Sequence, residues 1–517
     1  MGLTAMDVMV VVNGDSWASM AVANKYVHER DIPPGNIVVL NGLPDYERVA
    51  VAEFRESVLG PVFREIQRRG LGDRISCIVY SSDIPYAIMF DGDRGDEETS
   101  RAVGTLGSLT GMTYLYADVL EKDYAGYTSL DSNAYYRDEY LPGAATGTPE
   151  IDAKLNEANE LMRDEEFEKA ENILDTLIEK KSAYARLHFE LARCRYRAEQ
   201  DDTRVLAALE QAAKNGWYDL LRVQNSFKKL AEQNEEAMAA LEEAVLENAA
   251  RLETAPTRPF AAQVGWDQRG EATDAPEAPR YMLSAMLPAT SGRGLSVDEA
   301  FRNLERSARA DASADGRGII CFMKSRDIRS RVRRWGFDAA IRELAEAGVA
   351  GKVVEGVLPK KLDIMGLCVG AAAFDWAAGG NTLHPGAIAE HLTSFGGALQ
   401  PGNTQTPLTE FLRHGAALSS GTVMEPLALQ AKFPTPFIQA HYARGASAIE
   451  ALYMSVQGPY QLLVAGDPLT RLFSGFESLS VEGVKSGQAL VGTVPLRATT
   501  TPEEIAERVS VFVDGQL

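Results

Sequence analysis

Cys368 and His391 are residues of the C-terminal half that could form a nucleophile and its base. A cysteine needs a nearby imidazole or a helix N-terminus to become a thiolate. Cys368 lies in the apolar run 364–369, and His391 lies near the end of the run 387–397. If these runs are neighbouring parallel strands, both side chains could reach the crevice at the strands' carboxyl ends, where ligands bind. The alternative is a core cysteine, because free cysteines are commonly buried.

Asp467 is the third candidate for a catalytic role. It follows the apolar run 462–465 within the segment Gly466-Asp-Pro468, so we expect it at the same carboxyl edge of the sheet. A turn role is the alternative, because Asp and Pro are typical turn residues.

Five more polar residues are candidates for this crevice: Asp15, Ser16, Asp83, His414 and Glu425. The first two belong to a turn between an apolar run and a helix, where backbone N–H groups can hold an anion. An N-cap explains them equally well. Imidazoles and carboxylates are what an acid–base site requires, whereas caps, turns and surface positions are the structural alternative.

The spacing of these residues favours no cofactor. The histidines form no HxH or HxxxH pair and the four cysteines form no CxxC pair, so a metal site would have to be assembled in space. The turn Asn13-Gly-Asp-Ser16 has one Gly and no Lys, unlike a phosphate-binding loop. We therefore predict no bound metal and no cofactor.

The elements that must position these residues follow an α/β pattern. Strand-like runs alternate with helical segments, which indicates parallel βαβ units. Short apolar strands without polar alternation are typical of a sheet with helices on both faces. The predicted strands lie at 8–12, 37–40, 75–80, 318–322, 352–357, 364–369, 387–397 and 462–465, and the predicted helices at 17–30, 49–69 and 337–347.

The pattern divides the chain into five parts. Residues 1–147 and 280–475 are predicted to build one α/β domain together. Residues 148–252, which are rich in Ala, Leu, Glu and Lys and contain no Pro from 150 onward, read as inserted helical hairpins. They resemble tetratricopeptide repeats, although a plain helical bundle gives the same pattern. Residues 253–279 read as a linker.

The tail, 476–517, alternates apolar and polar residues, as half-buried antiparallel strands do. Three stretches, 478–483, 492–498 and 508–514, resemble the first strands of an immunoglobulin-like module. Such a module normally needs about 100 residues. We therefore expect either a chain that continues past Leu517 or a partial sheet.

Composition excludes several classes of protein. The apolar fraction is 45% and the charged fraction 24%, which is ordinary for a globular chain and excludes a mostly disordered one. The net charge is −21, so nucleic acid and anionic membrane surfaces are unfavourable partners. The sequence contains no apolar run long enough to span a membrane and no visible signal peptide. The localisation is left open, with a cytoplasmic protein or a removed leader as the alternatives.

Several motifs resemble a poorly characterised bacterial family of predicted exported α/β proteins. The resemblance covers roughly residues 1–140 and 280–473, and implies an exported protein whose leader has been removed. The family has no established activity. The motifs that carry it are Val11-Val-Asn-Gly-Asp-Ser16, Asp31-Ile-Pro-Pro-Gly-Asn-Ile37, Pro385-Gly-Ala-Ile-Ala-Glu-His-Leu-Thr-Ser-Phe395, the stretch from Gly415 through Gly421-Thr-Val-Met-Glu-Pro426, and Pro459-Tyr-Gln-Leu-Leu-Val-Ala-Gly-Asp-Pro468.

The C-terminal half is also similar in layout to the gingipain and caspase-like cysteine peptidases. These enzymes carry a His at the end of one strand and a Cys at the end of the next, and can end in an immunoglobulin-like module. The run 364–370 corresponds to the His strand but contains Cys368 and no His. The run 387–397 corresponds to the Cys strand but ends in Ser394-Phe-Gly-Gly397. The resemblance therefore implies a peptidase-like fold without the usual dyad.

Three hypotheses about function follow. The first is a dyad-less, peptidase-like pseudoenzyme that binds proteins or peptides through the helical repeats, as an interaction or scaffold protein. The second is a cysteine-dependent hydrolase with a rearranged Cys368–His391 site. The third is an exported protein that binds a cell surface or a carbohydrate.

Overall fold

The computed structural model describes residues 2–43, 46–95, 101–267, 269–314, 316–474, 478–485 and 488–501. The chain forms two compact units. The sheet unit comprises Met1–Tyr136, Thr257–Arg329 and Ala347–Leu517, and the helical unit comprises Arg137–Pro256 and Ser330–Glu346.

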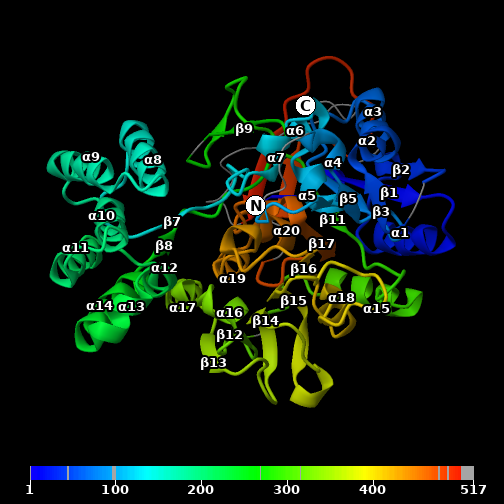
Figure 1. Cartoon of the computed structure of the whole chain (residues 1–517). Helices are drawn as coiled ribbons and strands as arrows, with labels where there is room; N and C mark the ends of the chain where they lie inside the picture. Colours follow the sequence, from blue (N-terminus) through cyan, green and yellow to red (C-terminus); the bar gives the residue numbers. More distant parts are fainter. Residues whose placement is uncertain are drawn as a thin grey trace. The chain divides into compact units, whose positions relative to one another are not determined.

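The sheet unit is built on one ten-stranded, mostly parallel sheet, which confirms the predicted α/β class (Figure 1). Both stretches of chain contribute to this sheet, because β4 pairs in parallel with β11 from Cys77–Leu283 to Tyr80–Met286. In spatial order the strands are β13 (Gly351–Glu355), β12 (Ile319–Lys324), β14 (Asp363–Gly370), β15 (Thr382–Leu392), β16 (Leu418–Thr422), β17 (Leu462–Gly466), β11 (Leu283–Met286), β4 (Cys77–Tyr80), β1 (Val8–Asn13) and β2 (Ile37–Leu40).

Strand β17 interrupts the parallel order. It runs antiparallel to β16 over five residue pairs, from Leu418–Gly466 to Thr422–Leu462, and meets β11 at the single pair Met286–Ala465. The last strand of the sheet to appear in the sequence therefore lies in its interior. This direction decides on which edge the residues after β17 emerge.

Helices of the sheet unit form two groups. α1 (Trp17–Glu29), α15 (Val297–Ala308) and α18 (Leu408–Arg413) contact one another in series. The second group consists of α5 (Leu109–Tyr114), α19 (Ile438–Ala443) and α20 (Ala448–Tyr453). Tyr114 of α5 stacks against Tyr453 of α20, with ring centroids 4.1 Å apart, and so joins this group over the sheet.

Smaller elements complete this unit. A three-stranded sheet is formed by β3 (Arg48–Ala50), β5 (Ala87–Met89) and β6 (Leu106–Ser108). The helix predicted from residue 49 begins only after β3 and contains a π-helical turn, as α2 (Val51–Phe54), Arg55–Leu59 and α3 (Gly60–Arg68). The other short elements are α4 (Asp91–Arg94), α6 (Tyr116–Glu121), α7 (Tyr124–Thr128), β9 (Gly265–Trp266) and β10 (Ala272–Thr273), and α16 (Ile328–Arg331) begins in this unit.

The helical unit has a hydrophobic core of its own. Two hairpins, α8–α9 and α10–α11, pack in series, and each turn contains a glutamate with positive φ, Glu165 or Glu199. The short strands β7 (Glu139–Tyr140) and β8 (Glu253–Thr254) pair at the two ends of the insertion. The helices are α8 (Pro149–Arg163), α9 (Phe167–Lys180), α10 (Ala185–Arg197), α11 (Asp202–Lys214), α12 (Leu220–Ser226), α13 (Lys228–Gln233), α14 (Glu235–Ala250) and α17 (Phe337–Glu346).

Strand β16 is not among the strands predicted from the sequence. The segment Leu418–Thr422 is small and polar, yet all five residues are buried between β15 and β17. A side chain at Gly421 would meet Gly396 at 2.4 Å. Small residues are therefore required because neighbouring backbone closes over this strand.

In the tail, β18 (Ser478–Glu482) and β19 (Arg497–Thr501) form an antiparallel pair. The second strand begins at Arg497 rather than at 492, after Pro495, which has no N–H for a ladder. The third expected strand, at 508–514, lies outside the described residues. Within the described parts of the chain, no helix is long and apolar enough to cross a membrane.

Candidate functional site

The loops after β4, β11 and β15 meet at one edge of the main sheet. Arg293 N donates to Leu399 O at 2.7 Å, and Tyr86 Oη donates to Gln400 Oε1 at 3.1 Å. Thr290 N donates to Ser82 Oγ at 2.8 Å. The carboxyl ends of these strands therefore share an edge, which is where open α/β sheets bind ligands.

Cys368 and His391 lie on neighbouring strands but do not form the expected pair. In the β14–β15 register, Cys368 is opposite Glu390, and His391 is opposite Val369. Directly opposed residues share a face of a sheet, and successive residues alternate between faces. The thiol and the imidazole therefore point to opposite faces of the sheet. The pairing expected from the sequence would need a register shifted by one residue.

Contacts of the two side chains agree with this register. The Cys368 thiol lies 4.0 Å from Nε2 of Gln439 on α19. On the other face, Nε2 of His391 donates to Ala371 O at 2.8 Å, and its ring contacts Phe411 of α18 edge-on at 5.7 Å. Both side chains are buried. The sheet thus separates two enclosed environments, and the helix groups of α18 and α19 cover opposite faces.

Asp467 does not lie at the carboxyl edge. Because β17 is antiparallel to β16, its carboxyl end emerges beside the amino end of β16, where Asp467 N donates to Ala417 O at 2.8 Å. The buried Asp467 carboxylate accepts from Nε and Nη2 of Arg30, at 2.7 and 2.6 Å. Burial raises the pKa of Asp467, and the charge of Arg30 opposes this rise. This group ties α1 to the end of β17 and is a structural ion pair.

Three of the candidate residues do come together at the carboxyl edge: Asp15, Ser16 and Asp83. Ser16 is the N-cap of α1 and accepts from Ser19 N at 3.1 Å, while its hydroxyl donates to Asp83 at 2.5 Å. Asp15 is exposed and accepts from Gly42 N at 2.6 Å. Ser16 is thus confirmed as the N-cap of α1, and its hydroxyl also orients the buried carboxylate of Asp83.

Asp83 occupies an unusual backbone conformation. Its φ is +58°, in the left-handed region, which Asp tolerates better than most residues. Asn13 Nδ2 donates to its carbonyl at 2.6 Å, and Ser82 Oγ donates to its carboxylate at 3.1 Å. Strained residues of this kind cluster at functional sites. Since two hydrogen bonds leave further acceptor positions on a carboxylate, Asp83 can still receive donors from a ligand.

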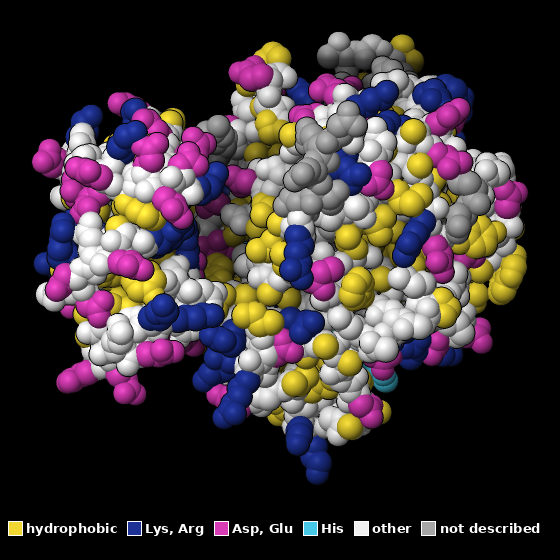
Figure 2. Space-filling model, in the orientation of Figure 1, with side chains coloured by type: hydrophobic (Ala, Val, Ile, Leu, Met, Phe, Trp, Pro, Cys, Tyr) yellow, Lys and Arg dark blue, Asp and Glu magenta, His cyan; other side chains and the backbone are white. Residues whose placement is uncertain are grey.

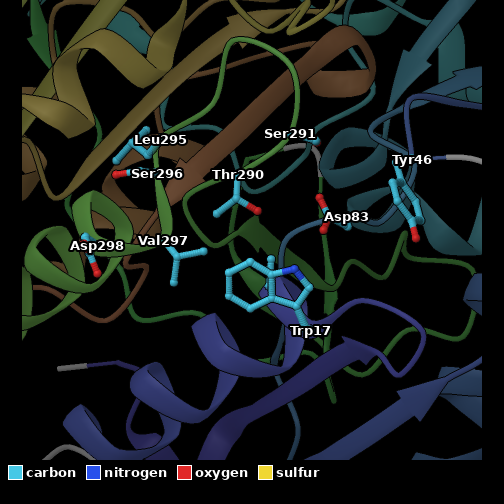
Figure 3. A pocket seen from close by; sticks show the side chains of 10 residues that line it. Trp17, Tyr46, Asp83, Thr290, Ser291, Leu295, Ser296, Val297 and Asp298 are labelled. Atoms are coloured by element: carbon cyan, nitrogen blue, oxygen red, sulfur yellow. The ribbon is translucent and has the colours of Figure 1, made fainter.

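A cavity of about 570 Å³ opens beside Asp83 (Figure 3). This volume is within the range of small-molecule sites. The indole of Trp17, 69% exposed, lies between Asp83 and Tyr46 on one side and Val297 and Asp298 on the other. The remaining lining residues are Ala18, Thr290, Ser291, Leu295 and Ser296.

His414 and Glu425 belong to neither the cavity nor the Cys368 environment. His414 pairs with Glu410 at 3.1 Å and stacks on Trp376 at the end of α18. Glu425 is exposed and accepts from Leu427 N at 2.9 Å, which closes a turn after β16. Both residues therefore have local structural partners. Among the residues that the structure describes, no three His, Cys, Asp or Glu side chains could together hold a metal ion.

Trp17, Thr290 and Ser296 line the cavity and were not among the sequence-based candidates. A usable signal for Trp17 is its place directly after the cap residue Ser16, at the point where a helix leaves a strand. Thr290 follows β11, a strand too short and too close to the linker to stand out in the sequence.

Comparison of the chain with protein-family models, curated proteins and solved structures returns no match.

Proposed function

We propose that the protein is a peptidase-like α/β protein without a working cysteine–histidine pair, and that it acts by binding proteins or peptides. The observation that carries the proposal is the β14–β15 register, which separates Cys368 from His391 by the thickness of the sheet. The resemblance to gingipain and caspase-like peptidases supports the fold side of the proposal. A rearranged cysteine hydrolase is disfavoured because its nucleophile and base would face different sides.

The helical unit offers a site for a partner. Glu190 of α10 is fully buried and pairs with two arginines, Arg193 and Arg222, the latter at 2.7 Å. The guanidinium of Arg222 also lies over the rings of Phe189 and Trp217, at 5.1 and 5.8 Å, while 39% of its side chain is exposed. Glu190 and the two rings therefore hold the partly exposed guanidinium of Arg222 in a fixed orientation. Such an arrangement suits an acidic side chain or a terminal carboxylate of a peptide.

The other charged side chains of this unit do not point to a single class of ligand. On the face shown in Figure 2, acidic and basic side chains are both spread over the helices of the unit. Arg222 therefore differs from the other charged residues of the unit because a buried carboxylate and two aromatic rings hold its side chain, and not because of its charge alone.

Native thiols are expected to react slowly with iodoacetamide. All four cysteines are buried, and burial raises the pKa of Cys194 and of Cys321 to about 11. A thiol with that pKa is ionised to only about one part in 10,000 at pH 7, so alkylation should accelerate as the pH rises. Site-resolved mass spectrometry should show labelling of Cys368 at least about 100-fold slower than in the denatured protein. Fast labelling of native Cys368 that disappears in His391→Gln would contradict the proposal.

Peptide binding is expected to depend on Arg222. A random peptide library displayed on phage, selected against the full chain, should return peptides with an acidic residue or a free carboxyl end. Arg222→Ala should weaken their binding at least about fivefold, because a charge-assisted hydrogen bond contributes roughly 1.5–3 kcal/mol. Arg163→Ala, an exposed arginine at the end of α8, is the matched control and should leave binding unchanged. Equal losses in both variants would contradict recognition at Arg222.

A further inference from the structure

The carboxyl edge of the sheet carries a second site, and its walls come from four segments. The cavity lies at the first turn of α1, beside Tyr46 and the loop that follows β4, and along the segment that leads from β11 into the first turn of α15. Ser82 and Thr290 tie the two loops together, with their hydroxyl oxygens 2.6 Å apart. Ser82 also donates to Asp83, and Ser16 holds the same carboxylate from the side of α1. The position of Asp83 is therefore fixed from three elements before any ligand arrives.

The charges at the cavity disfavour an anion. In the part of the chain that the structure describes, the cavity lining contains two carboxylates, Asp83 and Asp298, and no Lys or Arg. Two helix N-termini face it, and these would attract negative charge, but both are already capped. Ser16 accepts from Ser19 N, and Ser296 forms a capping box with Glu299. An acidic ligand would therefore meet like charge without a free cationic partner.

The apolar part of the lining is dominated by the exposed indole of Trp17. Trp17 presents its indole to the cavity, and Leu295 and Val297 extend the apolar wall toward α15. A large aromatic residue left 69% exposed at the mouth of a cavity gains free energy when a ligand covers it. Three hydroxyls stand around this surface: that of Thr290 already bonds Ser82 and that of Ser296 already caps α15, whereas that of Ser291 can both donate to and accept from a ligand. The cavity thus combines a stacking surface with hydroxyl and carboxylate partners.

We propose that this cavity binds a neutral carbohydrate, with a pyranose ring stacked on Trp17 and its hydroxyl groups donating to Asp83 and Asp298. A pyranose has one apolar face of C–H groups for the indole and a rim of hydroxyls for the polar partners. Its neutrality avoids repulsion by the two carboxylates. This inference goes beyond the proposed function and does not depend on it, since it uses neither the thiols nor the helical unit.

Titration of the full chain with cellotetraose, maltotetraose and chitotetraose tests the inference. Isothermal calorimetry should detect binding of at least one of these sugars with a dissociation constant of about 1 mM or below. Trp17→Ala and Asp83→Asn should each weaken that binding at least about tenfold. Met20→Ala is the matched control, because Met20 is an exposed apolar residue of the same helix outside the lining. It should change the dissociation constant less than about twofold.

Trp17→Ala and Asp83→Asn are chosen because neither substitution should disturb the fold. Trp17 is largely exposed, and Asn is another residue that tolerates the left-handed conformation of position 83. Unchanged melting temperatures of both variants would verify this. Binding that persists in Trp17→Ala, or an equal loss in Met20→Ala, would overturn the inference, as would the failure of all three sugars to bind.

Salt dependence separates a sugar from a cationic ligand. Binding of a neutral sugar should be nearly independent of NaCl concentration, since screening acts on charged pairs. A lysine oligomer is the comparison probe, because an ammonium group could also lie over Trp17 beside the two carboxylates. If the lysine oligomer binds through Trp17 in a salt-sensitive manner and the sugars do not bind, the cavity prefers cationic ligands and the inference is wrong. None of these outcomes bears on the thiol or peptide experiments, so the two proposals can fail separately.

Discussion

Replacement of Arg30 by methionine is expected to lower the free energy of unfolding by about 3–5 kcal/mol, because it leaves a buried carboxylate without its partner. The side chain of Asp467 is fully buried, and Arg30 binds it through two nitrogens. Arg30 also pairs with Asp311 at 2.5 Å and donates to Thr470 at 3.0 Å. Urea denaturation followed by circular dichroism measures the change.

A double variant makes this prediction sharper. Adding Asp467→Asn to Arg30→Met removes the charge that the first substitution leaves unpaired, so the double variant should be more stable than the sum of the single effects implies. Strict additivity would show that Arg30 does not act through Asp467. Arg68→Met is the control: Arg68 pairs with Glu65 at an exposed position, and its loss should have little effect.

Substitution of Gly466 by alanine should also destabilise the protein strongly, by about 2–6 kcal/mol. Its φ is +128°, and a Cβ there would lie 1.9 Å from Ala417 O, a backbone atom of the residue just before β16. Backbone strain of this kind costs about 1–3 kcal/mol. Overpacking adds about 1–3 kcal/mol more. Thermal and urea unfolding of the variant would measure the sum.

Two other glycines separate the contributions. Gly356 has a similar φ of +109°, but an added Cβ would meet nothing within 4 Å, so Gly356→Ala reports backbone strain alone. Gly72 has neither a positive φ nor a close neighbour, and Gly72→Ala should be nearly neutral. If Gly466→Ala costs no more than Gly356→Ala, the contact between β16 and β17 is less tight than the structure indicates.

Local sequence was enough to place many of the strands. β2 was predicted at its observed bounds, Ile37–Leu40, because a β-branched run follows two prolines and a glycine. The Ser16 cap was visible for a similar reason, since a Ser before a helical run is a common start signal. These features depend on residues close in sequence, whose preferences can be read without a fold.

The predicted site differs from the structure where contacts between distant parts of the chain decide the positions of its residues. Nothing in the residues of β17 reveals that it runs antiparallel to β16, and that direction moves Asp467 to the opposite edge. The pairing of Cys368 and His391 likewise depends on register, because a shift of one residue exchanges the two faces of a strand. The cavity at Trp17 escaped prediction because its walls come from four segments that only the folded sheet brings together.

The interior position of β17 has a consequence for biosynthesis. Ribosomes add about 5–20 residues per second, so roughly 9–35 s separate the synthesis of β11 from that of β17. Until then β11 and β16 have no strand between them, and each leaves unpaired backbone groups. Nascent chains are thus exposed to aggregation during this interval. Chaperones that cover unpaired strand edges would bind this protein before its release from the ribosome. A chain truncated before residue 462 would lack β17, so β11 and β16 would each keep an unpaired edge.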